Sequence, residues 1–316
     1  MREDLYQLAI SDSLQNKVEK SIALLQEYSR VPKTLDMFDP NYYGCTSFGK
    51  DSVVIMRLCE MAGIKNITWN HSLTTLDPPE LIQFGRKSYP NTIIHKPKIP
   101  MLRILETVKG PPTRLNRWCC DKYKEQGGLG KCKILGVRAT ESPRRKASWR
   151  QFTAHVKGTI KGGAIVAPIL YWTDEDIWQF IHGELIPYCE LYDEGWKRLG
   201  CIGCPMAGTC GRRREFDRWP KYERAWRRAI KTFVEKWSGV PILRPRWVSM
   251  EGKHPFKPIV GEIKERRYVD KTERVEEGFI TYRRWFDLQG CNDPDSLWRW
   301  WMQNEDEPSG CTMGMF

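Results

Sequence analysis

The sequence lacks any run of eighteen apolar residues, and its opening stretch MREDLYQLAISDSLQNKVEK carries charges where a secretory signal has an apolar centre. We therefore expect a soluble, cytoplasmic protein with no membrane partner. An internal repeat is also lacking, which argues against solenoids and propellers. With 316 residues, 41% of them hydrophobic, the chain is long enough for one large domain with an appendage or for two modest domains.

A disulfide framework is not expected, although the chain holds eleven cysteines. Thiols of a cytosolic protein stay reduced, so metal ligation or thiol chemistry is the expected use of most of them. Cys59, on an expected apolar helix, and Cys132, beside an expected strand, are predicted to be small core residues.

Acidic residues are missing from residues 143–161, which hold six Lys and Arg, and residues 211–236 hold ten Lys and Arg against four acids. These two segments account for the whole formal charge of +12. A polyanionic partner, from a nucleoside triphosphate to a nucleic acid backbone, is one explanation. A solvated helix face is the simpler explanation of a charge run taken alone.

Candidate strands alternate with candidate helices through the first part of the chain. We expect strands at 42–47, 67–70, 92–96, 133–137 and 164–168, and helices at 12–29, 51–62, 79–88, 99–108 and 173–182. This order predicts an α/β fold with a mostly parallel twisted sheet and helices on both faces. Thr173 and Asp176 predict a capping box, and Gly63 predicts a helix C-terminal cap.

Apolar residues change their pattern beyond residue 210. Aromatic and aliphatic residues recur every three or four positions through 219–237, and Pro220 suits a first helical turn. Since helical spacing alone explains this stripe, we expect it to be core and not a platform for stacking bases.

The hexapeptide Ser-Phe-Gly-Lys-Asp-Ser, which starts at residue 47, lies between an expected strand and an expected helix. Backbone amides at a helix N-terminus bind anions, and Gly49 lets the backbone approach a ligand closely while the serine hydroxyls reach phosphate oxygens. Lys50 can neutralise a phosphate charge, and Asp51 can hold Mg²⁺ opposite the phosphates. The hexapeptide is not a Walker motif, and a plain strand-to-helix turn is the alternative.

The hexapeptide resembles the pyrophosphate loop (PP-loop) of the adenine nucleotide α-hydrolase superfamily, which usually reads Ser-Gly-Gly-Lys-Asp-Ser. Phe48 replaces the first glycine, as in the phosphoadenosine phosphosulfate (PAPS) reductase branch. Five further elements resemble that branch in its own order: TTLDPPEL at 74–81, RWCCDKYK at 117–124, GVRATESPRR at 136–145, PILYWTDEDIWQFI at 168–181 and IPYCELYDEGWKRLGCIGCP at 186–205. The resemblance to this PAPS reductase-like family thus covers residues 40–205.

The resemblance implies an adenosine nucleotide across the strand ends, with its phosphates on the loop; open α/β sheets bind ligands at that edge. Its nucleotide-binding residues would be Ser47, Phe48, Gly49, Lys50, Asp51, Ser52, Arg138, Glu141 and Arg145. Its catalytic residues would be Lys50, Asp51, Arg138 and Arg144, because guanidinium groups suit phosphate and sulfate. Surface salt bridges remain the alternative for any single arginine.

The cysteines in 119–120 and 201–210 indicate a metal site. Adjacent residues have Cα atoms only about 3.8 Å apart, which is awkward for one tetrahedral zinc ion but workable for two irons of a cluster. A 4Fe-4S cluster is the expected cofactor, and structural zinc or unligated thiols are the alternatives. The candidate ligands are Cys119, Cys120, Cys201, Cys204 and Cys210. The adenosine phosphosulfate (APS) reductases hold a cluster with a Cys-Cys pair and a Cys-x2-Cys; a set without Cys119 resembles the DNA phosphorothioation branch.

The intact Lys50-Asp51-Ser52 resembles the branches that split ATP, because the reductases usually lose it. We therefore predict an ATP pyrophosphatase that binds ATP with Mg²⁺ and activates an acceptor for sulfur transfer. DNA is a reasonable acceptor, and a cysteine desulfurase is the expected sulfur donor, with Cys45 or Cys119 as a carrier. One alternative is an APS/PAPS reductase with Cys311 as nucleophile, although Cys311 lacks the family's Glu before it and Gly after it.

Another alternative is a non-catalytic, metal-containing module that binds nucleic acid. The predicted organisation has four parts. They are an N-terminal helical segment at 1–36, a nucleotide-binding PP-loop domain at 37–185, a cysteine segment with a basic amphipathic helix at 186–238, and a C-terminal extension at 239–316.

Overall fold

A computed structural model describes residues 3–28, 41–114, 116–128, 130–155, 163–238, 242–249, 267–268, 274–282 and 293–302. The chain divides into two compact units. Unit 1 comprises residues 1–98 and 119–202, and unit 2 comprises residues 99–118 and 203–316. The predicted domain ranges stay predictions. None of the described helices has the length and apolar character that crossing a bilayer requires.

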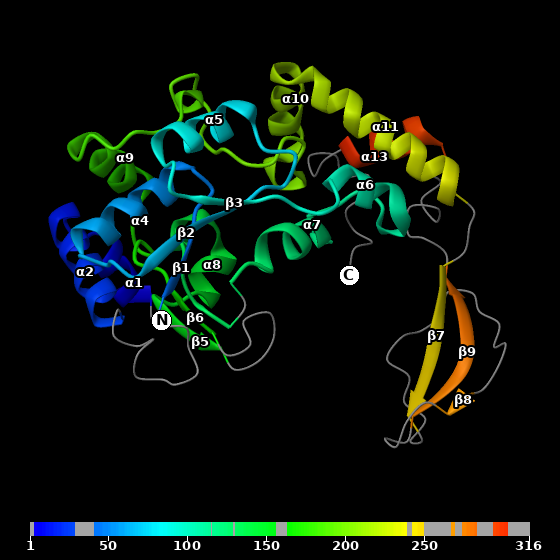
Figure 1. Cartoon of the computed structure of the whole chain (residues 1–316), viewed down its shortest axis with the longest axis horizontal. Coiled ribbons are helices and arrows are strands. Elements are labelled where there is room, and N and C mark those ends of the chain that lie inside the picture. The colour runs from blue at the N-terminus through cyan, green and yellow to red at the C-terminus, as the bar shows by residue number, and fades with distance from the viewer. Residues whose placement is uncertain are drawn as a thin grey trace. The chain divides into compact units, whose positions relative to one another are not determined.

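Unit 1 is built on a six-stranded sheet of order β3-β2-β1-β4-β6-β5 (Figure 1). Neighbouring strands are parallel except β5, which pairs antiparallel with β6 at the edge. The expected α/β fold with a mostly parallel sheet is confirmed. The strands are β1 (Tyr42–Cys45), β2 (Ile67–Ser72), β3 (Ile93–His95), β4 (Cys132–Ile134), β5 (Phe152–His155) and β6 (Gly163–Val166).

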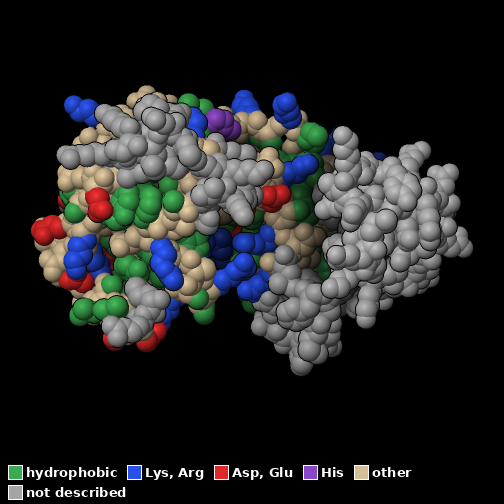
Figure 2. Space-filling model, turned by 90° about the horizontal axis from the view of Figure 1, so that it is seen from below, with side chains coloured by type: hydrophobic (Ala, Val, Ile, Leu, Met, Phe, Trp, Pro, Cys, Tyr) green, Lys and Arg blue, Asp and Glu red, His purple; other side chains and the backbone are tan. Residues whose placement is uncertain are grey.

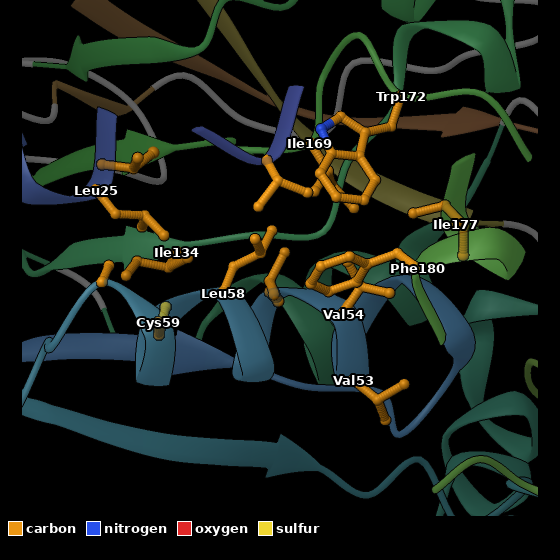
Figure 3. Packing of buried hydrophobic residues seen from close by; sticks show 14 of the residues in the cluster. Leu25, Val53, Val54, Leu58, Cys59, Ile134, Ile169, Trp172, Ile177 and Phe180 are labelled. Carbon is orange, nitrogen blue, oxygen red and sulfur yellow. The ribbon is translucent and has the colours of Figure 1, made fainter. Parts of the chain in front are cut away.

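Three helices cover one face of this sheet: α2 (Leu14–Tyr28), α4 (Lys50–Met61) and α9 (Asp174–Gly183). Their apolar side chains share one buried cluster with the strands (Figure 3). Cys59 and Cys132 belong to this cluster, as predicted. On the opposite face the ring of Tyr43 packs against Gly128, where a Cβ would lie 2.6 Å from the ring. The sheet is therefore covered on both sides.

Helix ends in unit 1 follow the predicted signals. Gly63, which follows the C-cap residue Ala62 of α4, has φ +70°, and its amide donates to the carbonyl of Glu60. Thr173 accepts from the amide of Asp176, and the Asp176 carboxylate accepts from the amide of Thr173, so the capping box of α9 is present. Asp176 also pairs with Lys17 of α2 at 2.5 Å. The cap of α9 is therefore also the tie between two helices.

Some predicted elements are wrong. The helix expected at 12–29 is present as α2, which Ser13 caps by accepting from the amide of Asn16, but the preceding helix α1 (Glu3–Ile10) was not given bounds. The helix expected at 99–108 is shortened to α6 (Met101–Ile104) and continues as the π-helix η1 (Leu105–Lys109). Edge strand β5 and helix α8 (Pro143–Ser148) lie in the basic segment, where no element was expected.

Five further elements lie in unit 1, and the first residue of one of them, α7, belongs to unit 2. They are α5 (Pro79–Ser88), α7 (Trp118–Cys120), the π-helix η2 (Asp121–Glu125) and the 3₁₀ turns η3 (Ala139–Glu141) and η4 (Glu190–Tyr192).

Unit 2 contains α6, η1, the 3₁₀ turn η5 (Pro205–Ala207), α10 (Gly208–Arg218), α11 (Pro220–Trp237), α13 (Pro294–Met302) and the strands β7 (Ile242–Ser249), β8 (Arg267–Tyr268) and β9 (Arg274–Tyr282). The three strands form an antiparallel sheet of order β7-β9-β8. Pro220 opens α11, as predicted. Trp226, Ile230 and Phe233 are fully buried, which confirms that the aromatic stripe is core.

Candidate functional site

The strand order creates a crevice at one edge of the sheet in unit 1. β1 connects to β2 on one side, whereas β4 lies on the other side of β1, so the order reverses between β1 and β4. Ligands of open α/β sheets bind at such a switch point, outside the carboxyl ends of the strands. Residues 46–49 follow β1 and residues 135–138 follow β4. The predicted phosphate loop and Arg138 therefore belong to the same edge.

The loop backbone is held in place by the side chain of Phe48. Phe48 has φ +59°, a left-handed conformation that costs a non-glycine residue roughly 1–2 kcal/mol. Its ring is 1% exposed and stacks on His71 with ring centroids 4.6 Å apart. Gly85 of α5 leaves room for the ring, since a Cβ there would lie 2.4 Å from it. Burial of the ring offsets the backbone strain, so the loop keeps the glycine-like turn without glycine.

Hydroxyl groups form hydrogen bonds within the loop and to its backbone. The hydroxyls of Ser47 and Ser52 lie 2.9 Å apart. The amide of Lys50, at the start of α4, donates to the hydroxyl of Tyr192 at 3.0 Å. A Cβ on Gly49 would lie 3.2 Å from that hydroxyl, so glycine permits the close approach. Burial raises the pKa of Tyr192, which keeps it a neutral phenol.

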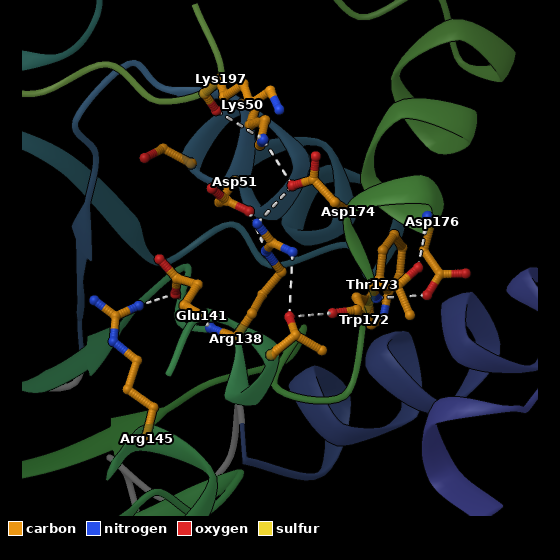
Figure 4. Close-up of polar contacts among 12 residues, drawn as sticks. Lys50, Asp51, Arg138, Glu141, Arg145, Trp172, Thr173, Asp174, Asp176 and Lys197 are labelled. Carbon is orange, nitrogen blue, oxygen red and sulfur yellow. Dashed lines mark hydrogen bonds and ion pairs between the residues drawn. The ribbon is translucent and has the colours of Figure 1, made fainter. Parts of the chain in front are cut away.

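Four charged side chains meet beside the loop, and we call them the charged quartet: Lys50, Asp51, Arg138 and Asp174 (Figure 4). Arg138 donates from Nε to Asp51 at 2.5 Å and from Nη2 to Asp174 at 2.9 Å. Lys50 Nζ lies 2.7 Å from the same Asp174 oxygen and 3.1 Å from the carbonyl of Lys197. The quartet therefore contains two cations and two carboxylates.

The members of the quartet differ in their exposure to solvent. Lys50 and Arg138 are 5% and 6% exposed, whereas the side chain of Asp174 is 50% exposed. Burial alone would raise the pKa of Asp174, but hydrogen bonds and charges from Lys50 and Arg138 outweigh it and hold the pKa below its usual value. Two buried cations thus share one solvent-accessible carboxylate, which a more highly charged anion could replace.

The segment after β4 positions Arg138. The Arg138 amide donates to Glu141 at 3.1 Å, so Glu141 caps η3. Glu141 also pairs with Arg145 on α8, which means that two predicted nucleotide-binding residues bind each other. Arg144 is exposed on α8, outside the quartet. The structure therefore brings together Lys50, Asp51 and Arg138 but leaves Arg144 apart.

Asp174 and Tyr192 were missed by the sequence analysis. Asp174 is the first residue of α9, inside a recognised capping box, and its acidic neighbours offered a helix-dipole explanation that needed no further role. Tyr192 lies in η4, within the matched segment 186–205. No local signal pairs either residue with Lys50, because 124 and 142 positions separate them along the chain.

The predicted metal ligands divide between the units. Cys119, Cys120 and Cys201 belong to unit 1, and Cys204 and Cys210 to unit 2. Within the part of the chain that the structure describes, no three His, Cys, Asp or Glu side chains gather closely enough to hold a metal ion. The 4Fe-4S cluster and the alternative zinc ion stay predictions.

Cys45 has the wrong environment for a sulfur carrier. Burial raises the pKa of its thiol to about 11, so the reactive thiolate is scarce near neutral pH. Asp51, by contrast, fits a role in holding Mg²⁺ with a nucleotide. Its carboxylate is 24% exposed, and Mg²⁺ in such sites needs only one or two carboxylates besides phosphates and water.

The family model of the phosphoadenosine phosphosulfate reductase domain matches residues 41–207, which is more than half of the chain. An uncharacterised protein of Methanocaldococcus jannaschii is 29% identical over 235 residues, 70% of this chain and 54% of that protein. An adenosine 5′-phosphosulfate reductase of Bacillus cereus (strain 03BB102) is 28% identical over 177 residues, 52% of this chain and 72% of that enzyme. The chain thus spans about half the length of the M. jannaschii relative.

Two solved structures resemble the chain at low identity. One is a phosphate complex of a PAPS reductase from Candida auris, with 20% identity, a TM-score of 0.41, and coverage of 57% of this chain and 93% of that chain. The other is a Candida glabrata FMN adenylyltransferase with FMN and an ATP analogue, with 15% identity, a TM-score of 0.43, and coverage of 63% and 69%. From the matched domain, the chain belongs to the phosphoadenosine phosphosulfate reductase family.

Proposed function

We propose that this chain is an ATP pyrophosphatase of the PAPS reductase family, which splits ATP into AMP and pyrophosphate to activate an acceptor for sulfur transfer. One observation carries the proposal: Lys50 and Asp51 of the intact Lys50-Asp51-Ser52 form the charged quartet with Arg138 and Asp174 at the topological switch point. A β,γ-pyrophosphate group supplies the negative charge that two buried cations and a helix N-terminus accept.

The reaction begins when an acceptor oxygen attacks the α-phosphorus. A bond forms from that oxygen to phosphorus, the bond to the oxygen bridging the α and β phosphates breaks, and pyrophosphate leaves with the electron pair. Lys50 and Arg138 hold the departing pyrophosphate, with Asp174 displaced from between them. When bound with ATP at Asp51, Mg²⁺ would neutralise phosphate charge and favour departure of pyrophosphate.

Sulfur transfer completes the proposed reaction. A sulfur nucleophile at the oxidation level of sulfide bonds to the activated acceptor atom, and the bond from that atom to the adenylate oxygen breaks and releases AMP. In this proposal DNA is the acceptor and the cytoplasm is the location. A cysteine desulfurase supplies the sulfur as a protein persulfide, and a second thiol reduces its outer sulfur to the level of sulfide while the two thiol sulfurs form a disulfide. The basic charge of residues 143–161 and 211–236 supports a nucleic acid acceptor.

Sulfonucleotide reduction is the second candidate, because relatives such as the B. cereus protein are named adenosine 5′-phosphosulfate reductases. That reaction needs a nucleophilic thiolate, and the predicted nucleophile Cys311 lies outside the described residues.

Measuring pyrophosphate release from ATP in the presence of Mg²⁺ tests the proposed pyrophosphatase activity. We expect AMP and pyrophosphate as products, and Lys50→Ala should lower kcat/KM by about a hundredfold or more because it removes a cation from the leaving group. Asp51→Ala should lower it comparably. Lys65→Ala is the matched control, since Lys65 is exposed and follows α4.

Two outcomes would contradict the pyrophosphatase. One is unchanged turnover in Lys50→Ala. The other is sulfite release from APS or PAPS, lost in Cys311→Ser, with no turnover of ATP, which would establish the reductase.

A further inference from the structure

We infer that unit 2 carries a binding surface for the phosphodiester backbone of nucleic acid, on the exposed faces of α10, α11 and α13. Its centre is a row of four exposed cations on α11, which we call the basic stripe: Lys221, Arg224, Arg228 and Lys231. The claim that this surface holds the acceptor of the sulfur transfer rests on the proposed function. The claim that it binds nucleic acid is argued from the residues of unit 2 alone.

The basic stripe lies on the side of α11 opposite its buried side. Steps of three and four residues place its members on one helix face, about 15 Å long at a rise of 1.5 Å per residue. The residues packed into the core alternate with them along the helix: Trp226, Ala229, Ile230, Phe233 and Val234. The stripe is therefore a continuous exposed ridge of positive charge.

A solvated helix does not explain this ridge. Exposed charges on α2 are mixed, with Lys20 between Glu19 and Glu27, and Arg57 on α4 pairs with Glu60. Like charges three or four residues apart destabilise a helix by a few tenths of a kcal/mol per pair. In the stripe, the pair from Lys231 to Glu235 is long, at 3.8 Å, and it lies in the last turns. The repulsion indicates a surface used for an external anion.

A cavity of about 430 Å³ extends the surface beyond α11. Arginines from three helices line it, in excess over two acidic residues. The arginines are Arg213 from α10, Arg227 from α11 and Arg299 from α13, and the acids are Asp217 and Glu223. Arg227 is held by Glu223 at 2.9 Å and by the ring of Trp298, 4.2 Å from its guanidinium carbon. A guanidinium fixed in this way loses little conformational entropy when it binds a phosphate.

The aromatic floor of the cavity indicates backbone binding and not base stacking. Trp298 and Phe216 are 7% and 3% exposed, and Arg227 covers the ring of Trp298, so no open ring face is offered to a base. Contacts to phosphates carry no sequence information, and we expect binding that depends on salt and tolerates any sequence. Figure 2 shows a group of Lys and Arg side chains on a different face of the molecule, which does not include the outer side of α11.

An anionic membrane is the competing polyanion. Membrane-bound basic helices insert an apolar face into the lipid, but the apolar face of α11 is occupied. Trp226 stacks on Trp301 of α13 with ring centroids 4.5 Å apart, and Trp237 donates to the carbonyl of Glu106 in η1. Only charge remains for a partner, and a nucleic acid offers a regular row of charges.

Binding to a short fluorescent DNA duplex, measured by anisotropy against salt concentration, tests the inference. We expect Arg224→Gln/Arg228→Gln to weaken binding on the order of tenfold at low salt and to reduce the slope of log affinity against log salt by about two. Arg86→Gln/Lys87→Gln, which removes two exposed charges from α5, is the charge-matched control and should match the wild type. A single-stranded DNA and an RNA duplex identify the favoured backbone.

Three results would overturn the inference: no duplex binding by the wild-type protein, equal weakening in the control, or stripe-dependent binding to phosphatidylserine vesicles without binding to any nucleic acid. Circular dichroism melting of both variants shows whether α11 stays folded, and Arg224→Lys/Arg228→Lys should restore binding if charge is the cause. Pyrophosphate release by the wild type is measured in the same preparation. Stripe-dependent binding without pyrophosphate release would disprove the proposed function and keep this inference.

Discussion

At the scale of single residues, Asp174 pairs with both buried cations of the quartet, Lys50 and Arg138. Within the described residues, Asp51 pairs with Arg138 alone, whereas Asp174 pairs with both cations, and half of the Asp174 side chain is exposed. An anionic ligand must therefore either displace this carboxylate or compete with it. Removing its charge while keeping its shape should make the site more receptive to anions.

We predict that Asp174→Asn binds inorganic pyrophosphate several-fold more tightly than the wild type, as measured by isothermal titration calorimetry.

Asp174→Asn should also change the pH dependence of the free energy of unfolding, with a defined sign. Because the folded protein lowers the pKa of Asp174 from 3.8, the carboxylate favours folding above that pH, and this contribution is lost as the pH falls further. The difference in unfolding free energy between wild type and variant should therefore shrink below about pH 4. Weaker pyrophosphate binding by the variant would show that Asp174 takes part in binding.

Single residues also show where prediction from sequence fails. Lys50 and Asp51 could be predicted because their chemistry lies in one hexapeptide at a strand-to-helix junction. Asp174 and Tyr192 could not, because both contact Lys50, which lies more than a hundred positions away. The pair of Asp174 with Lys50 is decided by tertiary structure, whereas Glu141 and Arg145 pair four positions apart, within reach of a local pattern.

At the scale of elements, the contact between α4 and the segment after β4 fixes the distance from Asp51 to Arg138. Gly136 makes this contact possible, because a Cβ there would lie 3.0 Å from the backbone oxygen of Asp51. Neither partner is the flexible end of a side chain, so an added methyl group must move one backbone segment away from the other.

We predict that Gly136→Ala lowers kcat/KM for pyrophosphate release roughly tenfold, because small misplacements of catalytic groups are costly. The unfolding free energy, measured in urea, should fall by only about 1–3 kcal/mol, as for other overpacked sites. Gly183→Ala is the control, since no heavy atom lies within 4 Å of the position of a Cβ there. A loss of stability without a loss of turnover would place the contact outside the function.

Elements were predictable where a local signal ends them. α5 has the predicted bounds, and α9 starts at its capping box. β5 was missed because it pairs antiparallel at the edge, within a segment whose basic charge dominates its pattern. The helix expected at 99–108 is regular only over α6; the chain then changes to the π-helix η1, which has a kink at Thr107 (φ −91°, ψ −170°).

At the scale of the whole molecule, each unit is assembled from two separate stretches of chain. In unit 2, residues 99–118 meet the later stretch through Trp301 of α13. Trp301 is 3% exposed and donates to the carbonyl of Pro112 at 2.9 Å, and its own carbonyl accepts from Arg212 at 2.6 Å. No pattern in the sequence predicts this discontinuous arrangement, since linear segments were the only organisation that composition could suggest.

We predict that Trp301→Ala destabilises unit 2 by about 3–5 kcal/mol, the usual cost of deleting a buried tryptophan side chain. Native-state hydrogen exchange followed by mass spectrometry measures the effect in each unit. Amides of α10 and α11 should exchange faster, and those of β1, β4 and α4 in unit 1 should keep their protection, because separate units open with separate free energies.

Two further variants make this prediction specific. Trp301→Phe keeps an aromatic ring against Trp226 but loses the donor to Pro112, so its effect should be smaller than that of the alanine variant. Leu8→Ala, at a side chain that is 69% exposed, should leave exchange in both units unchanged. If Trp301→Ala also removed protection from β1 and α4 by the same free energy, the chain would unfold as one cooperative body, and changes in unit 2 would then alter nucleotide binding through global stability alone.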